Sequence, residues 1–256
     1  MAVLVGTSGW SYKAWAKTFY PDGVTGTGEL GYYVQNFPTV EINASFYRLP
    51  FKNMVSGWYD RSPPDFLFAV KGSRLITHYK RLAGIAHPLK KFLTRVGGLK
   101  EKLGPILWQL PPHQAKDLPR LEKFLARLQK ESPKQRHAVE FRHRSWMEDK
   151  KTFELLREHG AAIVHLSSQR MPMDLRTTAD FVYMRFHGLE GGAAHDYTPD
   201  ELRPWAEFFR AQSKKGRDVF VYFNNDINTR APQNAQILIQ LVGDRAVSKL
   251  KLAQAA

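Results

Sequence analysis

Cysteine is absent from this chain of 256 residues, and acidic residues are scarce beside basic ones. The lack of cysteine excludes disulfide bonds, thiolate catalysis and zinc sites of the cysteine type, and it suits a reducing cytosol. The shortage of acid leaves 38 Lys and Arg against 24 Asp and Glu, a formal net charge of +14. Such an excess favours anionic partners, among them phosphates, nucleic acid and acidic surfaces.

Long apolar runs are missing as well. No stretch approaches the roughly 18 to 20 apolar residues that a membrane span requires. The start, Met1-Ala-Val-Leu-Val, turns polar at Gly6-Thr-Ser-Gly and carries no basic leader, unlike a signal peptide. The sequence therefore predicts a cytoplasmic chain without a membrane partner.

Familiar nucleotide-binding and hydrolase motifs are also lacking. Gly6-Thr-Ser-Gly has neither the lysine of a Walker motif nor the third glycine of a dinucleotide fingerprint, so we interpret it as a tight turn. No Gly-x-Ser-x-Gly elbow surrounds Ser8, Ser11 or Ser73, which argues against serine hydrolase chemistry.

The positive charge is concentrated between Lys71 and Lys102. This stretch holds nine Lys and Arg and one acid, Glu101. Two interpretations remain open: a solvated face that only aids solubility, which is the usual behaviour of a charge run, or a surface that contacts phosphates. The histidines outside the expected strands are interpreted as surface residues, namely His78, His87, His113 and His195.

Eight short runs rich in β-branched and aromatic residues recur along the chain, and most are separated by segments with helical spacing. This alternation is typical of a parallel sheet, and eight strands are the number that an α/β barrel needs. Chains of about 250 residues commonly form one such barrel, so we expect residues 1–256 to be a single α/β barrel domain. The runs are 3–7, 39–43, 66–71, 105–110, 137–142, 161–166, 181–187 and 218–224.

Helical periodicity is clear in some of the intervals and weak in others. Residues 26–37 and 52–60 are short and interrupted by glycine, and 167–179, which carry Met-Pro-Met, predict a loop with at most one helical turn. We therefore expect an irregular (β/α)8 TIM-type barrel whose sixth helix is reduced or missing. The clear helices are expected near 88–103, at 118–128 with Asp117 as its cap, and near 147–159, 199–215 and 232–242.

Polar residues alternate along several of the expected strands. A strand buried on both faces should be apolar throughout, so a charged residue inside one needs a reason. Residues two apart lie on the same side of a strand, and the apolar residues between them, such as Ile42 and Phe141, should face the helices. The polar side chains then point into the barrel near the carboxyl ends of the strands, where barrel enzymes build their sites. The pairs are Glu41 and Asn43, Glu140 and Arg142, Arg185 and His187, and Tyr222 and Asn224, with Lys71, Gln109 and His165 closing three other runs.

This polar cluster has two interpretations. In one, the groups neutralise each other as a buried network, for example Glu41 with Arg142 or Glu140 with Arg185. In the other, they line a pocket for a ligand. Because a buried polar network offers no clear stability advantage over apolar packing, we favour the pocket.

The same residues fall within motifs spread over most of the chain. The motifs read Gly6-Thr-Ser-Gly-Trp-Ser-Tyr, Val40-Glu-Ile-Asn-Ala-Ser-Phe-Tyr-Arg-Leu-Pro, Phe68-Ala-Val-Lys, Leu103-Gly-Pro-Ile-Leu-Trp-Gln-Leu-Pro-Pro, Val139-Glu-Phe-Arg-His-Arg-Ser-Trp, Tyr183-Met-Arg-Phe-His-Gly and Val221-Tyr-Phe-Asn-Asn-Asp. From about residue 3 to about residue 240, in order, the chain resembles the domain-of-unknown-function 72 (DUF72, YecE-like) family. The resemblance implies an α/β barrel like those of xylose isomerase and endonuclease IV, with no assigned activity. Two positions depart from the family pattern: Arg144 stands where a proline is usual, and His165-Leu-Ser-Ser where an aspartate is expected.

The first functional hypothesis is an enzyme, of hydrolase or of isomerase or lyase type, that acts on a small ligand bearing a phosphate or carboxylate group. Arginine and lysine side chains would hold the anion, and a glutamate base with a histidine acid would move protons. The expected catalytic residues are Glu41, Glu140 and His187. The expected ligand-binding residues are Asn43, Lys71, Gln109, Arg142, Arg185, Asn224, Trp10 and Tyr47.

Two alternatives stay open. The barrels that the family resembles suggest a metal-dependent phosphodiesterase or isomerase, with Glu41, Glu140, His187 and Asn224 as ligands and Asp226 as a further candidate. Three cations beside two carboxylates argue against this, so we expect no metal and no required cofactor. The other alternative is a nucleic-acid binder that uses the basic segment together with aromatic residues near the strand ends, namely Trp10, Tyr12, Trp15, Tyr47 and Trp146.

Overall fold

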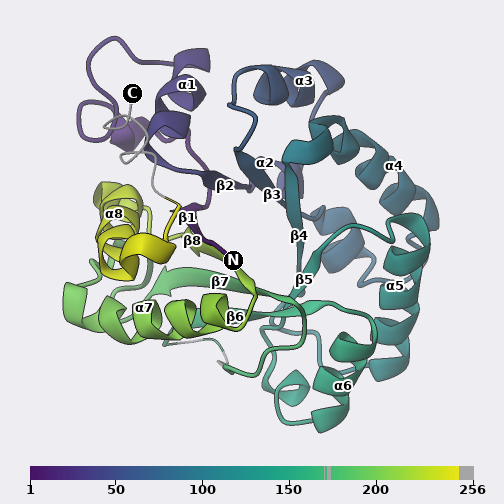
Figure 1. Cartoon of the computed structure of the whole chain (residues 1–256). Helices are drawn as coiled ribbons and strands as arrows, with labels where there is room; N and C mark the ends of the chain where they lie inside the picture. The colour runs from purple at the N-terminus through teal and green to yellow at the C-terminus, as the bar shows by residue number, and fades with distance from the viewer. Residues whose placement is uncertain (170, 172–173, 248–256) are drawn as a thin grey trace.

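The computed structural model describes residues 1–169, 171 and 174–247. Among these, eight parallel strands form one sheet in the order β1-β8-β7-β6-β5-β4-β3-β2, curled into a nearly closed barrel (Figure 1). The expected fold class is therefore confirmed. The strands are β1 Val3–Thr7, β2 Thr39–Ile42, β3 Leu67–Lys71, β4 Leu103–Gln109, β5 His137–Glu140, β6 Ala162–Ser168, β7 Phe181–Gly188 and β8 Asp218–Phe223.

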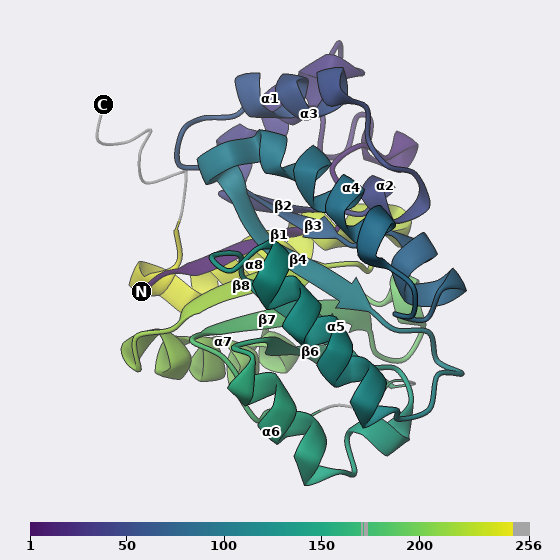
Figure 2. The same cartoon turned by 90° about the vertical axis from the view of Figure 1, so that its right-hand side faces the viewer.

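Helices cover the outside of the barrel, as Figure 2 shows for α4, α5 and α6. The two intervals with weak periodicity form full helices, α1 and α3, whereas the described residues between β6 and β7 (169, 171 and 174–180) contain no helix, as expected. Asp117 caps α5 by accepting a hydrogen bond from the Arg120 backbone N–H at 3.1 Å. The α-helices are α1 Thr27–Asn36, α2 Ala44–Tyr47, α3 Lys52–Asp60, α4 Ala86–Val96, α5 Leu118–Glu131, α6 Lys150–Glu158, α7 Pro199–Lys214 and α8 Arg230–Val242.

Alternation along the strands separates two apolar layers. Residues such as Ile42, Phe141 and Phe223 pack in the large cluster between sheet and helices, as the sequence predicts. The opposite faces contribute residues such as Leu107 and Tyr222 to a smaller cluster inside the barrel. The smaller cluster fills the barrel on the amino-terminal side of the polar side chains, which therefore occupy the end of the barrel where the strands finish.

His165 does not share the orientation that we predicted for it. Ala162, Val164 and Leu166 belong to the inner cluster, so the pleat sends His165 to the helix side, where its ring packs edge-on against Phe208 of α7 at 5.5 Å. Its Nδ1 donates to the Asp174 carbonyl oxygen at 2.7 Å. The predicted inward position of His165 was therefore wrong.

The barrel closes between β1 and β2 without a full ladder. The two strands share one isolated bridge, between Ser8 and Glu41, and the Tyr33 hydroxyl of α1 joins them: it accepts from the Thr7 N–H at 2.9 Å and donates to the Thr39 carbonyl oxygen at 3.1 Å. A Cβ atom on Gly6 would lie 2.1 Å from that same carbonyl oxygen. Only glycine therefore allows β1 to approach β2 this closely.

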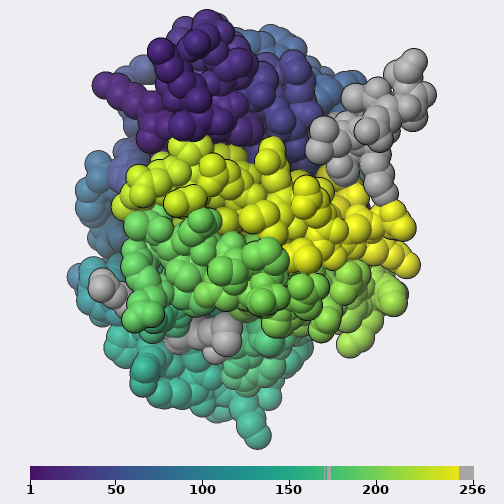
Figure 3. Space-filling model, turned by 90° about the vertical axis from the view of Figure 1, so that its left-hand side faces the viewer, coloured from purple at the N-terminus to yellow at the C-terminus, as the bar shows by residue number. Residues whose placement is uncertain are grey.

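The beginning of the chain and α8 also meet on the outside of the barrel, where Figure 3 shows the purple and yellow segments side by side. Trp15 Nε1 donates to Asp226 Oδ1 at 2.6 Å, and Thr229 Oγ1 donates to the Ala14 carbonyl oxygen at 2.9 Å.

In the described part of the chain, every helix is too short or too polar to cross a lipid bilayer.

Candidate active site at the barrel mouth

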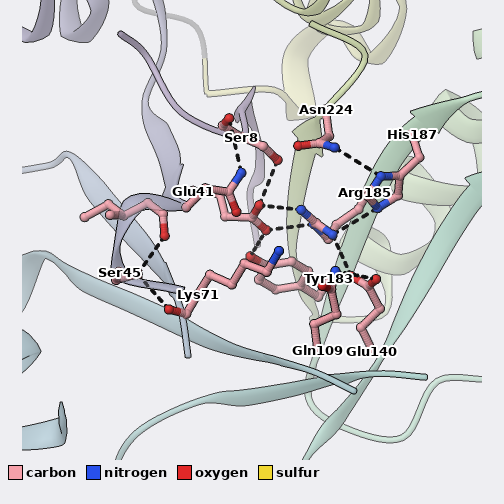
Figure 4. A network of polar contacts seen from close by, with 12 residues as sticks. Ser8, Glu41, Ser45, Lys71, Gln109, Glu140, Tyr183, Arg185, His187 and Asn224 are labelled. Atoms are coloured by element: carbon pink, nitrogen blue, oxygen red, sulfur yellow. Dashed lines mark hydrogen bonds and ion pairs between the residues drawn. The ribbon is translucent and has the colours of Figure 1, made fainter. Parts of the chain in front are cut away.

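A buried chain of ion pairs crosses the inside of the barrel (Figure 4). Arg185 of β7 lies between Glu41 of β2 and Glu140 of β5. Its Nε and Nη2 donate to the two carboxylate oxygens of Glu41 at 3.0 and 2.9 Å, and its Nη1 donates to Glu140 Oε2 at 2.7 Å. A bidentate pair of this kind fixes the guanidinium plane. One side chain thus ties three strands together.

Both carboxylates accept further hydrogen bonds. Tyr183 Oη and Ser8 Oγ each donate to Glu41 at 2.7 Å. Gln109 Nε2 and Arg142 Nε donate to Glu140 Oε1 at 2.8 and 2.7 Å. Each carboxylate is therefore surrounded by hydrogen-bond donors, which fix its position.

This inner network is sealed from solvent. Glu41 and Glu140 have no exposed surface, and Arg185 is 1% exposed. Burial alone raises the pKa of Glu140, but the charges of Arg185 and Arg142 outweigh it and hold that pKa well below its ordinary value. The Glu140–Arg185 pair is the one that the network interpretation named, whereas Glu41 pairs with Arg185 and not with Arg142. Glu41, Glu140 and Arg185 therefore form a buried layer below the open, carboxyl-terminal end of the barrel. We call this layer the floor and that end the mouth.

His187 sits at the edge of this floor, beside Arg185. Its Nε2 lies 2.9 Å from Arg185 Nη1, and its Nδ1 lies 3.1 Å from the Asn224 side-chain amide. Since a guanidinium can only donate, Nε2 accepts, the proton of the neutral ring is on Nδ1, and the amide must turn its oxygen toward it. Burial and the charge of Arg185 lower the pKa of His187 to about 3. The ring is neutral at physiological pH, and both its nitrogens have partners.

Lys71, at the end of β3, is in the opposite situation. It is buried, and its Nζ lies 4.4 Å from the centre of the Phe46 ring, but within the described residues it has no hydrogen-bond acceptor and no acidic partner. Burial, reinforced by the charge of Arg185, lowers the pKa of Lys71 to about 8. Figure 4 shows its amine reaching toward the centre of the cluster.

A second buried lysine shows how the fold satisfies an ammonium group when it needs to. Lys102 Nζ donates to the carbonyl oxygens of Tyr59 and Ser62 at 2.6 Å each and to Ser62 Oγ at 3.1 Å. Three donors thus meet three acceptors. By contrast, the Lys71 ammonium group has no acceptor within the described residues.

Two cavities flank the mouth of the barrel. One, of about 620 Å³, is lined by Arg142 and His187 together with Ser168 and the glycine-rich loop after β7. The other, of about 570 Å³, is lined by Trp10, Asn43 and Trp58. Asn43 donates to the Ser8 carbonyl oxygen at 3.3 Å, while its Oδ1 is buried without a partner in the described residues. Tyr47, the remaining expected ligand-binding residue, stands 64% exposed at the rim.

The arrangement does not suit a metal. Among the described residues, no three His, Asp or Glu side chains gather to hold an ion. Arg185 occupies the space between Glu41 and Glu140, and Asp226 accepts the hydrogen bond of Trp15 instead. The donor set proposed for a metal is therefore already engaged with cations and N–H groups.

The basic segment from Lys71 to Lys102 is not one surface. Lys71 and Lys102 themselves are buried, at opposite ends of the barrel wall. Part of the rest lines a cleft of about 640 Å³ between α3 and α4, which includes Lys90, Lys91 and Arg95. The charge run therefore divides between the mouth and the outer layer of helices.

Sequence reasoning missed four residues at the mouth. Ser8 continues the inward positions Leu4 and Gly6, and Tyr183 precedes Arg185 by two, so period two alone could have found both. Phe46 lies in the short helix α2, which no pattern in the sequence predicts. His78 was interpreted as a surface residue, but its ring packs on Phe46 at 4.9 Å, and burial and the Lys71 charge lower its pKa to about 4.

Fold and site together define a parallel α/β barrel. Its mouth is cationic, and the buried ion pairs of the floor beneath it neutralise one another. The chain belongs to the family described as proteins of unknown function DUF72, whose model matches residues 4–255.

Similar proteins have been found in several bacteria. The UPF0759 protein YunF of Bacillus subtilis is 24% identical over 94% of both chains. The UPF0759 protein YecE of Escherichia coli K12 is 31% identical over 55% of this chain and 48% of its own. A crystal structure of a DUF72 family protein, TM1631 of Thermotoga maritima, superposes with a TM-score of 0.84 at 29% identity, covering 95% of this chain and all of that one.

Proposed function

We propose that this protein is an enzyme that binds a small molecule through a phosphate or carboxylate group at the barrel mouth, with Lys71 as the residue that contacts the anion and exchanges a proton with the ligand. The observation that carries the proposal is the Lys71 side chain, which is only 9% exposed and whose ammonium group lacks an acceptor among the described residues, while that of Lys102 has three. Partial burial makes the charged form of Lys71 costly, so a fold that retains it there gains something else from it.

The charges around Lys71 support an anionic ligand. Arg185 and Arg142 together balance Glu41 and Glu140. Lys71 then adds one positive charge when protonated, and His187 adds none. A bound anion would neutralise that excess, and Arg142, whose side chain is 26% exposed, is placed to contact it from the side of the 620 Å³ cavity.

The same geometry changes the expected division of roles. Glu41 and Glu140 are fully occupied by arginine and hydroxyl donors, and His187 is neutral with both nitrogens engaged, so these three serve to position Arg185 and Arg142. Lys71, with a pKa of about 8, exists at neutral pH as a mixture of ammonium and amine. A group that titrates near the working pH is suited to general acid–base catalysis.

Thermal unfolding in the presence of inorganic phosphate tests the proposal. A ligand that binds only the native state raises its stability by about 2.7 kcal/mol at a concentration of 100 Kd. We expect phosphate to raise the Tm of the wild-type protein and of Lys130→Met, an exposed lysine on the outer helix α5, but not of Lys71→Met. Equal shifts in Lys71→Met and Lys130→Met, or no shift in the wild type with either phosphate or acetate, would show that the mouth is not an anion site.

A further inference from the structure

Large apolar side chains are exposed on one side of the barrel mouth. Scattered single residues of this kind are ordinary on a protein surface, but a contiguous group marks a binding site. Here five of them come from the two segments that follow β2 and β3, the strand that ends in Lys71. They are Tyr47 (64% exposed), Phe51 (50%), Met54 (40%), Leu75 (43%) and Tyr79 (66%).

Two of these side chains, Tyr47 and Tyr79, are organised around a single arginine. The Arg74 guanidinium carbon lies over the Tyr47 ring at 5.4 Å from its centre and over the Tyr79 ring at 5.5 Å. A face of each ring therefore looks toward the same point. Tyrosine faces combined with an arginine plane are the elements on which proteins stack planar bases.

This tyrosine pair is continuous with the anion position. Phe46 separates the two: Lys71 Nζ lies over one face of its ring at 4.4 Å, and the Tyr47 ring meets it edge-on at 5.1 Å. The four-residue helix α2 supplies both aromatic residues, Phe46 pointing inward and Tyr47 to the rim. A ligand with its anionic group at Lys71 thus has aromatic surface next to that group.

We propose that the ligand is a nucleotide, whose phosphate lies at Lys71 and Arg142 and whose base stacks on Tyr47 or Tyr79. This inference rests on the proposed anion site and names the chemistry of the rest of the ligand. Charge complementarity selects this occupant: the cationic mouth matches the phosphate, while Arg74 between two tyrosines matches a planar, electron-rich ring.

Calorimetric titration with adenosine 5′-monophosphate, ribose 5-phosphate and inorganic phosphate separates the contributions of the base, the sugar and the phosphate to binding. We expect adenosine 5′-monophosphate to bind the wild type more tightly than ribose 5-phosphate does. Tyr47→Ala and Tyr79→Ala, alone or together, should weaken the nucleotide by about 5- to 150-fold, the usual range for one stacked base, and leave inorganic phosphate unchanged. Ile227→Ala, at another residue that is 52% exposed, is the matched control and should change neither.

The outcomes distinguish this inference from the proposed function. Two results would overturn the nucleotide inference and leave the anion site standing, provided that phosphate binding still needs Lys71. One is equal affinity for ribose 5-phosphate and the nucleotide, and the other is no effect of the two tyrosine substitutions. A 5′-phosphorylated oligonucleotide shows whether the natural ligand is a nucleic-acid end or a free nucleotide. If the oligonucleotide binds more tightly than the mononucleotide, the ligand is a strand end; if the two bind equally, it is the free nucleotide. Tyrosine-dependent binding in either case supports the inference.

Discussion

Lys71 and Lys102 are both buried, yet they differ in what their ammonium groups contact. Lys102 donates to three oxygens, whereas Lys71 faces the Phe46 ring and has no acceptor within the described residues. At pH 7 we expect Lys71→Met to stabilise the protein by about 1–3 kcal/mol, because it removes a partly desolvated cation that has no acceptor in the described structure. Lys102→Met should destabilise it by a similar amount, because the two carbonyl groups lose their donor. Urea unfolding measures both changes.

The gain from Lys71→Met should depend on pH. Burial lowers the pKa of folded Lys71 from 10.5 to about 8, so the folded state bears the full cost of the charge below pH 8. Between about pH 8 and 10.5 the unfolded chain binds more protons, and wild-type stability rises relative to the variant. The difference between the two proteins should therefore shrink across that window. A pH-independent difference, or a less stable Lys71→Met at pH 7, would contradict the assignment.

The sequence could predict which side of a strand each of these residues faces, but not how deep it lies. Period two correctly directed Glu41, Glu140 and Arg185 into the barrel. Depth depends on strand tilt and on where each strand begins relative to its neighbours, and no local pattern encodes that. The ion pairs consequently lie in a sealed layer, and the unpaired Lys71 could be recognised only once all partners were placed. His165 was assigned by residue type instead of register, which is why its orientation was wrong.

The contact between β1 and β2 depends on a side chain of α1 where a ladder would normally form. The Tyr33 hydroxyl bridges the Thr7 N–H and the Thr39 carbonyl oxygen. We expect Tyr33→Phe to cost about 1–3 kcal/mol, because it leaves buried backbone groups without partners. Tyr32→Phe, at the neighbouring half-buried residue whose hydroxyl has no partner in the described structure, should stay within about 0.5 kcal/mol of wild type. Hydrogen exchange at the Thr7 amide should quicken only in Tyr33→Phe; equal stability of the two variants would mean that the bridge is not needed.

Most elements could be predicted because strands and helices have different apolar periods. The eight strands fall within one or two residues of the expected runs, since each is short, rich in β-branched residues and separated from the next by a helical pattern. The weak helices α1 and α3 are the exceptions. Glycine lowers the helical tendency of both segments, but Leu30, Tyr33 and Val34 of α1 are buried against the core, and tertiary packing stabilises such a helix more than its own propensity does.

At the scale of the whole molecule, the net charge of +14 is distributed over separate places. Lys71, Arg142 and Arg185 lie inside the barrel or at its mouth, and other cations line the cleft between α3 and α4. A ligand whose phosphate contacts only the mouth meets few of these charges, whereas a long polyanion lying along the outer cleft would meet many. The dependence of binding on salt therefore reports which part of the charge is used.

If Lys71 and Arg142 alone contact one phosphate, binding should depend weakly on salt. Even with the slope of about −0.7 per contact that single-stranded polyanions show, two contacts would lower the affinity for adenosine 5′-monophosphate by less than about tenfold between 50 and 200 mM salt. A double variant, Lys90→Gln with Lys91→Gln in the outer cleft, should leave both the affinity and the slope unchanged, while Arg142→Gln should weaken binding and flatten the slope. Loss of binding in the double variant would place the anion on the outer helices instead of at the mouth, because only a ligand in the outer cleft contacts Lys90 and Lys91.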